Sequence, residues 1–314
     1  MTETEKRRIS LLIKDKARET GFDLCGIAEA RSLSEYLPVL KKWCGQGMNA
    51  DMAFLARDFE KRFDPSLHLP GVKSVVVTGL SYNLEMMQKE SGVPLLSRYA
   101  YGIDYHEVIR GKLDSILGFI KNLAPGTTGK VFVDSGTIAE KMWAKEAGLG
   151  WQGRHSIIIN DTIGSFFLIG IILIDHELLH DKPYISDHCG DCRLCIEMCP
   201  TGAINEDKTI DARKCIANLT IENRGPIPEE IVPKLGRRVY GCDRCQEVCP
   251  WNSKALPCRT PEFLLDDEIS SMTANDWKSL TEQKFMELFS RSAIKRVKYD
   301  RFVRNIKAAL APDP

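Results

Sequence analysis

The chain has 314 residues, of which 43% are hydrophobic and 27% charged, a composition typical of a globular protein with two or three domains. Its 43 basic and 43 acidic residues cancel, which excludes recruitment of a polyanion by the field of the whole protein and leaves only local basic patches. Eleven cysteines and an N-terminus without the pattern of an export signal predict a cytoplasmic protein whose thiols serve metal or redox chemistry.

The first part of the chain predicts helices and strands in mixed order. A helix is expected over residues 5–20, where apolar side chains recur at helical spacing and Gly21 follows as a stop signal. Strands are expected over residues 22–27 and 72–80, and the second is β-branched enough for the middle of a sheet. A charged stretch with helical character, residues 33–62, lies between them.

The following part predicts the remaining elements of the first domain. A helix over residues 103–123 precedes a short strand over 131–133 and a second helix over 138–147. Residues 156–174 predict a hairpin of two buried strands with turn residues at its tip. The longest apolar run of the chain lies there and is far shorter than the roughly 20 residues needed to cross a bilayer. This order predicts an α+β domain over residues 1–180.

Eight of the eleven cysteines fall in a second predicted domain, residues 181–260. The first four follow the ferredoxin pattern C-x2-C-x2-C-x3-C-P, in which three thiolates bind one 4Fe-4S cluster and the fourth reaches the other. The second set, Cys242, Cys245 and Cys249, ends in the same x3-C-P element. Its fourth member, Cys215, lies far upstream in the sequence. Crossing over as in two-cluster ferredoxins assigns one cluster to Cys189, Cys192, Cys195 and Cys249, and the other to Cys199, Cys215, Cys242 and Cys245.

Two structural zinc sites are the alternative, since four cysteines with C-x2-C spacing also suit a tetrahedral zinc ion. Zinc sites do not need the x3-C-P element, which occurs here at both Cys199 and Cys249, so the pattern favours clusters. The three remaining cysteines are interpreted as small hydrophobic residues: Cys25, Cys44 and Cys258. Clusters only transfer electrons, so the preceding domain must determine what the electrons do.

Four sequence blocks carry a resemblance to a known family: Arg62-Phe63-Asp64-Pro65, RYAYGIDYH from Arg98, AGLGWQG from Ala147, and the segment from Gly241 to Asn252. Over nearly its whole length the chain resembles epoxyqueuosine reductases, cobalamin-dependent iron–sulfur enzymes that complete queuosine formation in tRNA. The resemblance implies an α+β fold: a nitroreductase-like cobalamin-binding domain, a ferredoxin-like domain with two 4Fe-4S clusters, and a short helical, basic C-terminal segment, residues 261–314. Reductive dehalogenases are related to this fold.

The implied reaction removes an epoxide oxygen from the modified base at the wobble position, consuming two electrons and two protons and releasing water. Asp134 matches the family's proton donor, which needs a pKa raised toward neutral, as burial against the corrin could supply. From sequence alone, an Asp between a strand and a helix is interpreted as a turn or N-cap residue. The resemblance places the cobalamin contacts on Arg57, Ser97, Asp134, Gly241 and Asp243.

The implied partners are tRNA with epoxyqueuosine in its anticodon loop and a low-potential electron donor such as flavodoxin or ferredoxin. Basic side chains supply phosphate contacts, and the predicted tRNA contacts are Arg224, Arg237, Arg238, Lys295 and Arg296. The protein is expected to act as a cytoplasmic monomer without membrane association. A corrinoid reductase of another substrate, such as an organohalide, and a non-catalytic electron-transfer protein are the alternatives. The missing export signal counts against a reductive dehalogenase. The 188 residues before Cys189 count against a simple electron-transfer protein.

The sequence departs from the family pattern at two places. Arg154 and His155 stand where the pattern has Lys and Asn, and Ser97 stands where some relatives have cysteine. His106 is not expected to bind cobalt, because these relatives hold cobalamin without a histidine below the metal. The departures concern cofactor contacts more than the reaction.

Overall fold

The computed structural model describes residues 2–85, 88, 90 and 92–311. A four-stranded sheet occupies its N-terminal half, with strand order β1-β2-β7-β4 and antiparallel pairing throughout. The strands are β1 (Leu24–Glu29), β2 (Ser74–Ser81), β4 (Gly129–Phe132) and β7 (Phe167–Ile174). Every residue of β2 is buried, which confirms the prediction of a strand in the middle of the sheet.

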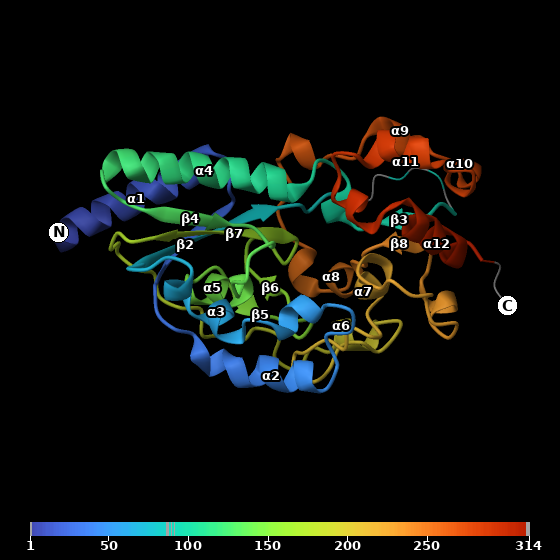
Figure 1. Cartoon of the computed structure of the whole chain (residues 1–314), viewed down its shortest axis with the longest axis horizontal. Coiled ribbons are helices and arrows are strands. Elements are labelled where there is room, and N and C mark those ends of the chain that lie inside the picture. Colours follow the sequence, from blue (N-terminus) through green and yellow to red (C-terminus); the bar gives the residue numbers. More distant parts are fainter. Residues whose placement is uncertain (1, 86–87, 89, 91, 312–314) are drawn as a thin grey trace.

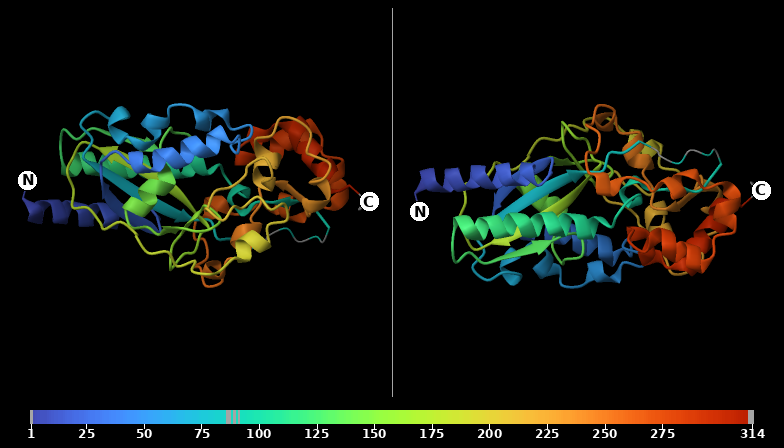
Figure 2. Two further views of the ribbon diagram at one scale, coloured as in Figure 1. Left: turned by 90° about the horizontal axis from the view of Figure 1, so that it is seen from below. Right: turned by 90° about the horizontal axis from the view of Figure 1, so that it is seen from above.

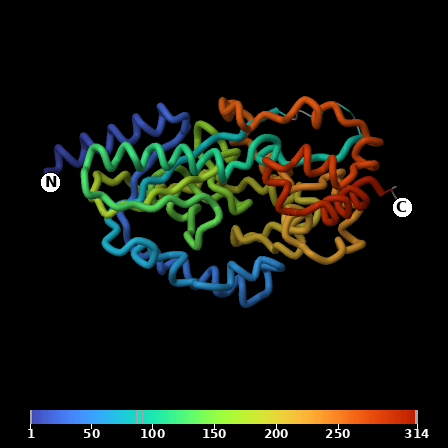
Figure 3. The backbone as a smooth tube through the Cα atoms, turned by 45° about the horizontal axis from the view of Figure 1, so that its top comes forward, coloured from blue at the N-terminus to red at the C-terminus, as the bar shows by residue number. Residues whose placement is uncertain are grey.

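Helices cover both faces of the sheet (Figures 2 and 3). Helices α1 (Glu3–Glu19) and α4 (Tyr105–Leu123) lie side by side on one face, where Val76 joins their apolar side chains in the largest core. Helix α5 (Glu140–Glu146) packs on the other face, where the neighbouring Val77 contributes to a second core. Successive side chains of a strand point to opposite faces, so the run of valines in β2 serves both cores.

Most expected elements are present, with shifted ends. Gly21 has a φ of +96° and follows α1, which confirms its predicted role as a stop. The charged stretch forms α2 (Leu37–Gly45) and α3 (Phe59–Phe63), with 3-10 turns around them. Within the described residues, no helix combines the length and apolar character that spanning a membrane requires.

The hairpin predicted over residues 156–174 is wrong. Strand β6 (Ile158–Ile159) pairs instead with β5 (Trp151–Gln152) in a small separate sheet, while β7 lies between β2 and β4. A single bridge between Asn160 and Gly164 retains the expected turn. The apolar run of β7 faces a core on each side of the sheet. A strand buried in this way pairs its backbone N–H and C=O groups with a neighbouring strand on each edge.

The cysteine-rich segment consists mainly of loops and short helices: α6 (Leu194–Glu197), α7 (Ile216–Ile221) and α8 (Arg244–Glu247). Its strand β8 (Arg238–Tyr240) pairs in parallel with β3 (Leu95–Leu96) of the N-terminal half. This pairing joins the loops that carry the cysteines to the first predicted domain.

The C-terminal helices gather at the end of the molecule opposite α1 (Figure 1). They are α9 (Asp267–Ser271), α10 (Ala274–Lys278), α11 (Glu282–Phe289) and α12 (Tyr299–Ala309). Trp277 and Phe302 pack in the same core as α1 and α4, so this segment shares its core with the first predicted domain. The buried Asn305 donates to the carbonyls of Thr220 and Val239 at 2.7 and 2.8 Å, which ties α12 to α7 and β8. The two predicted boundaries between the three domains stay predictions.

Candidate active site

Asp134 lies in the turn between β4 and α5. Its φ of +50° is a left-handed conformation that is costly for a residue other than glycine. The side chain of Glu140, in the first turn of α5, accepts a hydrogen bond from the backbone N–H of Asp134 at 2.6 Å. This bond stabilises the strained turn and so fixes the position from which the Asp134 side chain projects.

Two side chains at the start of α4 reach the Asp134 carboxylate. The hydroxyl of Tyr105 donates to Oδ2 at 2.6 Å, and Nε2 of His106 lies 3.6 Å from the same oxygen. On its other side, Nδ1 of His106 lies 2.7 Å from Oδ1 of Asp104, the N-cap residue of α4. The imidazole is therefore held between two carboxylates.

The charges of this site differ from the expectation for a proton donor. Loss of water raises the pKa of Asp134, but the hydrogen bonds from His106 and Tyr105 and the charge of His106 outweigh it, so the pKa is lowered overall. Burial lowers the pKa of His106, yet the two carboxylates raise it to about 9. The protein's own groups thus do not supply the raised pKa expected of Asp134, and the expected effect of burial against the corrin stays a prediction. A raised pKa is found instead at Glu140, where burial and the charge of Asp134 raise the pKa to about 8.

Asp134 and Lys141 are accessible to solvent but enclosed by protein on several sides. The Asp134 side chain is 58% exposed, although loss of water is the largest influence on its pKa. Lys141 is likewise exposed, and loss of water lowers its pKa. Its ammonium donates to the carbonyl of Ser156 at 2.9 Å, on the loop between β5 and β6. An accessible acid in such a half-enclosed position fits beside a large bound cofactor such as the implied cobalamin.

Two basic residues of the C-terminal segment approach the same site. Nζ of Lys295 lies 3.6 Å from Oδ2 of Asp104, and the charge of Arg296 helps to lower the pKa of Asp134. Arg296 also pairs with Glu222 at 2.8 Å. About half of each basic side chain is exposed, 49% and 50%. The structure therefore brings two predicted tRNA contacts to the predicted proton donor.

The other three predicted tRNA contacts differ in their exposure to solvent and in their contacts within the protein. Arg224 is exposed. Arg237 donates to the carbonyl of Val93 at 2.9 Å. Arg238 is 16% exposed and lies 3.6 Å from a carboxylate oxygen of Glu247. Arg224 is thus free to reach a phosphate, whereas the guanidinium of Arg238 already has a partner within the protein.

Three of the predicted cobalamin contacts meet beside β3 and β8. Ser97 and Asp243 are buried and hydrogen-bonded to each other, and Asp243 also accepts the backbone N–H of Arg98 at 2.8 Å. Gly241 has a φ of +72°, and a Cβ there would lie 2.5 Å from Cβ of Ser97, so both conformation and space require glycine. All three line one small pocket. Arg57 is exposed and does not line that pocket.

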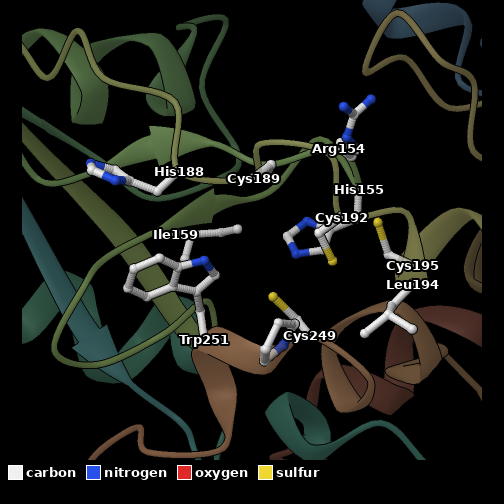
Figure 4. A pocket seen from close by; sticks show the side chains of 11 residues that line it. Arg154, His155, Ile159, His188, Cys189, Cys192, Leu194, Cys195, Cys249 and Trp251 are labelled. Carbon is white, nitrogen blue, oxygen red and sulfur yellow. The ribbon is translucent and has the colours of Figure 1, made fainter.

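The structure also brings the cysteines together in the predicted groups of four. One pocket, shown in Figure 4, is lined by Cys189, Cys192, Cys195 and Cys249. In the other group, burial raises the pKa of Cys215 and Cys242, and each is raised further by a neighbouring thiol, Cys199 and Cys215 respectively. Burial and the thiols of Cys242 and Cys215 likewise raise the pKa of Cys245. Eight sulfur ligands in two separate groups are the donor set of two 4Fe-4S clusters.

The spacing of the thiols bears on the zinc alternative. Across residues 2–85, 88, 90 and 92–311, no three His, Cys, Asp or Glu side chains converge as ligands of a single metal ion do. The thiols of the first group instead stand around a pocket. Thiols placed around a pocket are the arrangement that a 4Fe-4S cluster requires of its ligands.

Several residues of the site were not singled out from the sequence. Tyr105 lies within one of the four sequence blocks, but nothing in its type or spacing pointed to a contact with Asp134. Glu140 and Lys141 looked like ordinary polar residues of a helix. Only the left-handed turn at Asp134 brings Glu140 against the backbone of the proposed donor.

Comparisons with known proteins agree with this geometry. Residues 188–252 match the family model described as "4Fe-4S double cluster binding domain", and residues 62–135 match "Epoxyqueuosine reductase QueG, DUF1730". An epoxyqueuosine reductase of Cellulophaga algicola is 42% identical over 301 residues, which cover 96% of this chain and 98% of that protein. The chain belongs to the epoxyqueuosine reductase family. All eight assigned cysteines lie in the double-cluster match, so this member of the family binds two 4Fe-4S clusters and the zinc alternative falls.

Solved structures extend the likeness to the whole fold. A crystal structure of an epoxyqueuosine reductase with an epoxyqueuosine-modified tRNA stem loop matches 97% of this chain and 81% of that chain, with a TM-score of 0.86 and 29% identity. A reductive dehalogenase structure matches 95% of this chain and 39% of that chain, with a TM-score of 0.51 and 16% identity. The second likeness concerns the fold alone. The predicted relation between epoxyqueuosine reductases and reductive dehalogenases is confirmed at that level.

Proposed function

We propose that this chain reduces epoxyqueuosine to queuosine at the wobble position of tRNA, with cobalamin and electrons delivered through its two clusters. The observation that carries the proposal is the Asp134 site, where an accessible acid is held by Tyr105 and His106 in a chain that also carries both cluster loops. Membership of the epoxyqueuosine reductase family supports the substrate. A relative with a bound epoxyqueuosine-modified stem loop supports tRNA as partner.

Bound cobalamin supplies a strongly reducing cobalt centre. The proposed contacts of the cofactor are Ser97, which follows β3, Gly241 and Asp243, which follow β8, and Arg57. The Asp134 side chain is 58% exposed, so it is accessible to a cofactor and a modified base bound beside it.

Asp134 transfers a proton to the oxygen that leaves the epoxide. Its own lowered pKa leaves it a carboxylate at neutral pH, whereas His106, with a pKa of about 9, carries a proton 3.6 Å away. Glu140, with a pKa of about 8, holds another proton beside the backbone of Asp134. The two protons that balance the reaction, epoxide plus two electrons plus two protons giving alkene and water, therefore both lie next to Asp134.

Lys295 and Arg296 are proposed to bind phosphates of the anticodon loop. We expect the double substitution Lys295→Ala, Arg296→Ala to weaken binding of the stem loop. The plot of log binding constant against log salt concentration should also become less steep, by about 0.7 for each single-stranded phosphate that is no longer neutralised. Equilibrium binding of a labelled stem loop over a salt series measures both. Arg18→Ala, an exposed arginine on α1, is the matched control. An unchanged slope in the double variant would remove this pair from the tRNA interface.

The remaining parts of the proposal concern the setting of the enzyme. A low-potential donor such as flavodoxin or ferredoxin would pass single electrons to the clusters. The protein is proposed to work as a monomer in the cytoplasm, where thiols stay reduced and tRNA is available.

The test is conversion of the modified nucleoside. The anaerobically reconstituted protein, given cobalamin, a low-potential reductant and tRNA carrying epoxyqueuosine, is expected to produce queuosine, detected by mass spectrometry of the nucleosides as loss of one oxygen. Conversion must require cobalamin. Bound cobalamin and intact clusters without conversion would point to another reducible substrate, and protein that carries both clusters but binds no cobalamin would favour an electron-transfer role.

A further inference from the structure

His155 is a buried residue with one unused ring nitrogen. Its side chain is 3% exposed, on the loop between β5 and β6. Nδ1 accepts the backbone N–H of Ile157 at 3.2 Å, so this nitrogen carries no proton and the ring proton resides on Nε2. Nε2 is buried and has no hydrogen-bond partner among the residues that the structure describes. A buried N–H donor without an acceptor is rare in native proteins and calls for a partner.

The ring of His155 lies on the wall of the pocket formed by the first group of cysteines (Figure 4). Neighbouring packing holds it there: a Cβ on Gly153 would lie 3.0 Å from Cε1 of the ring and 2.6 Å from the side chain of Ile159. The glycine thus leaves room for the imidazole against β6. The orphan N–H donor therefore belongs to a ring that is fixed in place in the pocket where sulfur ligands gather.

We propose that His155 donates its Nε2–H to a sulfur atom of the cluster held by Cys189, Cys192, Cys195 and Cys249, and thereby raises the reduction potential of that cluster. The inference rests on the cluster assignment made above. Reduction adds one electron to the cluster and makes its sulfur atoms better acceptors, so a fixed N–H donor stabilises the reduced form more than the oxidised form. The proton stays on Nε2 and no covalent bond changes.

His155 stands where the resemblance to the family predicts Asn. The neighbouring Arg154 also lines the pocket, but its guanidinium donates to the carbonyl of Gly190 at 2.7 Å and lies 3.8 Å from Glu206. Arg154 is kept in every variant below, so its charge contributes equally to all of them.

Two substitutions separate the hydrogen bond from the packing. His155→Leu fills similar space without a donor, while His155→Gln keeps an N–H group near the position of Nε2. At a fixed potential, we expect His155→Leu to lower the ratio of reduced to oxidised cluster about tenfold, a downward shift of about 59 mV for a one-electron couple. His155→Gln should stay near the wild-type potential. A redox titration of the full-length protein with dithionite, followed by electron paramagnetic resonance, measures both clusters, and the second cluster is the internal control.

A second measurement does not depend on the folding of a variant without the donor. In wild-type protein labelled with 15N-histidine, we expect a hyperfine coupling between a histidine nitrogen and the reduced cluster. The coupling should persist in His188→Gln, which removes the exposed histidine of the same pocket, and disappear in His155→Gln.

Three results would overturn the inference. The first is an unchanged potential in a His155→Leu protein with full iron content, and the second is an equal shift of both clusters. The third is wild-type protein without a 15N coupling. Wild-type protein with iron for fewer than two clusters would instead refute the cluster assignment, and the inference with it, and iron analysis distinguishes the two failures.

Discussion

Asp134→Asn is expected to lower the turnover of epoxyqueuosine by about two to four orders of magnitude, the range that a positioned general acid contributes. Asparagine keeps the size of the side chain and can still accept the hydrogen bond from Tyr105. It cannot take up a proton from His106 and pass it on, so the leaving oxygen would have to be protonated by water. Single-turnover assays with modified tRNA would measure the loss, and the affinity for the stem loop should change little.

A suitable control is Asp161→Asn, an exposed aspartate in the turn that follows β6. This variant should keep wild-type turnover, cluster content and cobalamin binding. If Asp134→Asn retains turnover while binding cofactors normally, the proton must come from another group, and Tyr105, whose hydroxyl lies next to the same site, would be the first to examine.

The fold could be predicted where the signal is local. The β-branched run of β2 and the stop at Gly21 depend on neighbours in sequence, and both were identified correctly. The hairpin over 156–174 failed because adjacency in sequence favours pairing of consecutive strands. Strand β7 instead pairs with β2 and β4, and that choice depends on cores formed by distant helices.

The site could be predicted only in part for a similar reason. The cysteine pattern is read directly from spacing, because thiolates three positions apart bind one cluster and the thiolate four positions further on reaches the other. Asp134 could be identified only through family resemblance. Its partner Glu140 depends on a left-handed backbone angle, and its partner Tyr105 on the packing of α4 beside β4, and neither is encoded in a short motif.

The C-terminal segment takes part in positioning the active site. The backbone N–H groups of Ile103 and Asp104 donate to the carbonyls of Glu262 and Arg291, both at 2.7 Å. These bonds hold the beginning of α4, which carries Tyr105 and His106. The same segment supplies Lys295, close to Asp104. One short stretch of backbone therefore connects the residues beside Asp134 to the segment that carries two of the proposed tRNA contacts.

Cys215→Ser is expected to leave the protein with one 4Fe-4S cluster instead of two. Cys215 is the assigned ligand that the ferredoxin motif does not supply, since it precedes α7 far from the other cysteines of its group in sequence. Its thiol nevertheless lies close enough to Cys199, Cys242 and Cys245 for their charges to influence one another's pKa. Serine has no soft thiolate for iron, so the second cluster should be lost.

Iron and sulfide analysis would measure this loss as half of the wild-type content, and the remaining paramagnetic signal should be that of the cluster beside His155. Cys258→Ser is the matched control, because Cys258 packs against the main hydrophobic core and belongs to neither group of ligands. It should retain both clusters. Full iron content in Cys215→Ser would mean that another residue completes the second cluster. The crossed assignment of the eight cysteines would then have to be redrawn around that residue, because three thiolates from the second group do not complete a four-cysteine site.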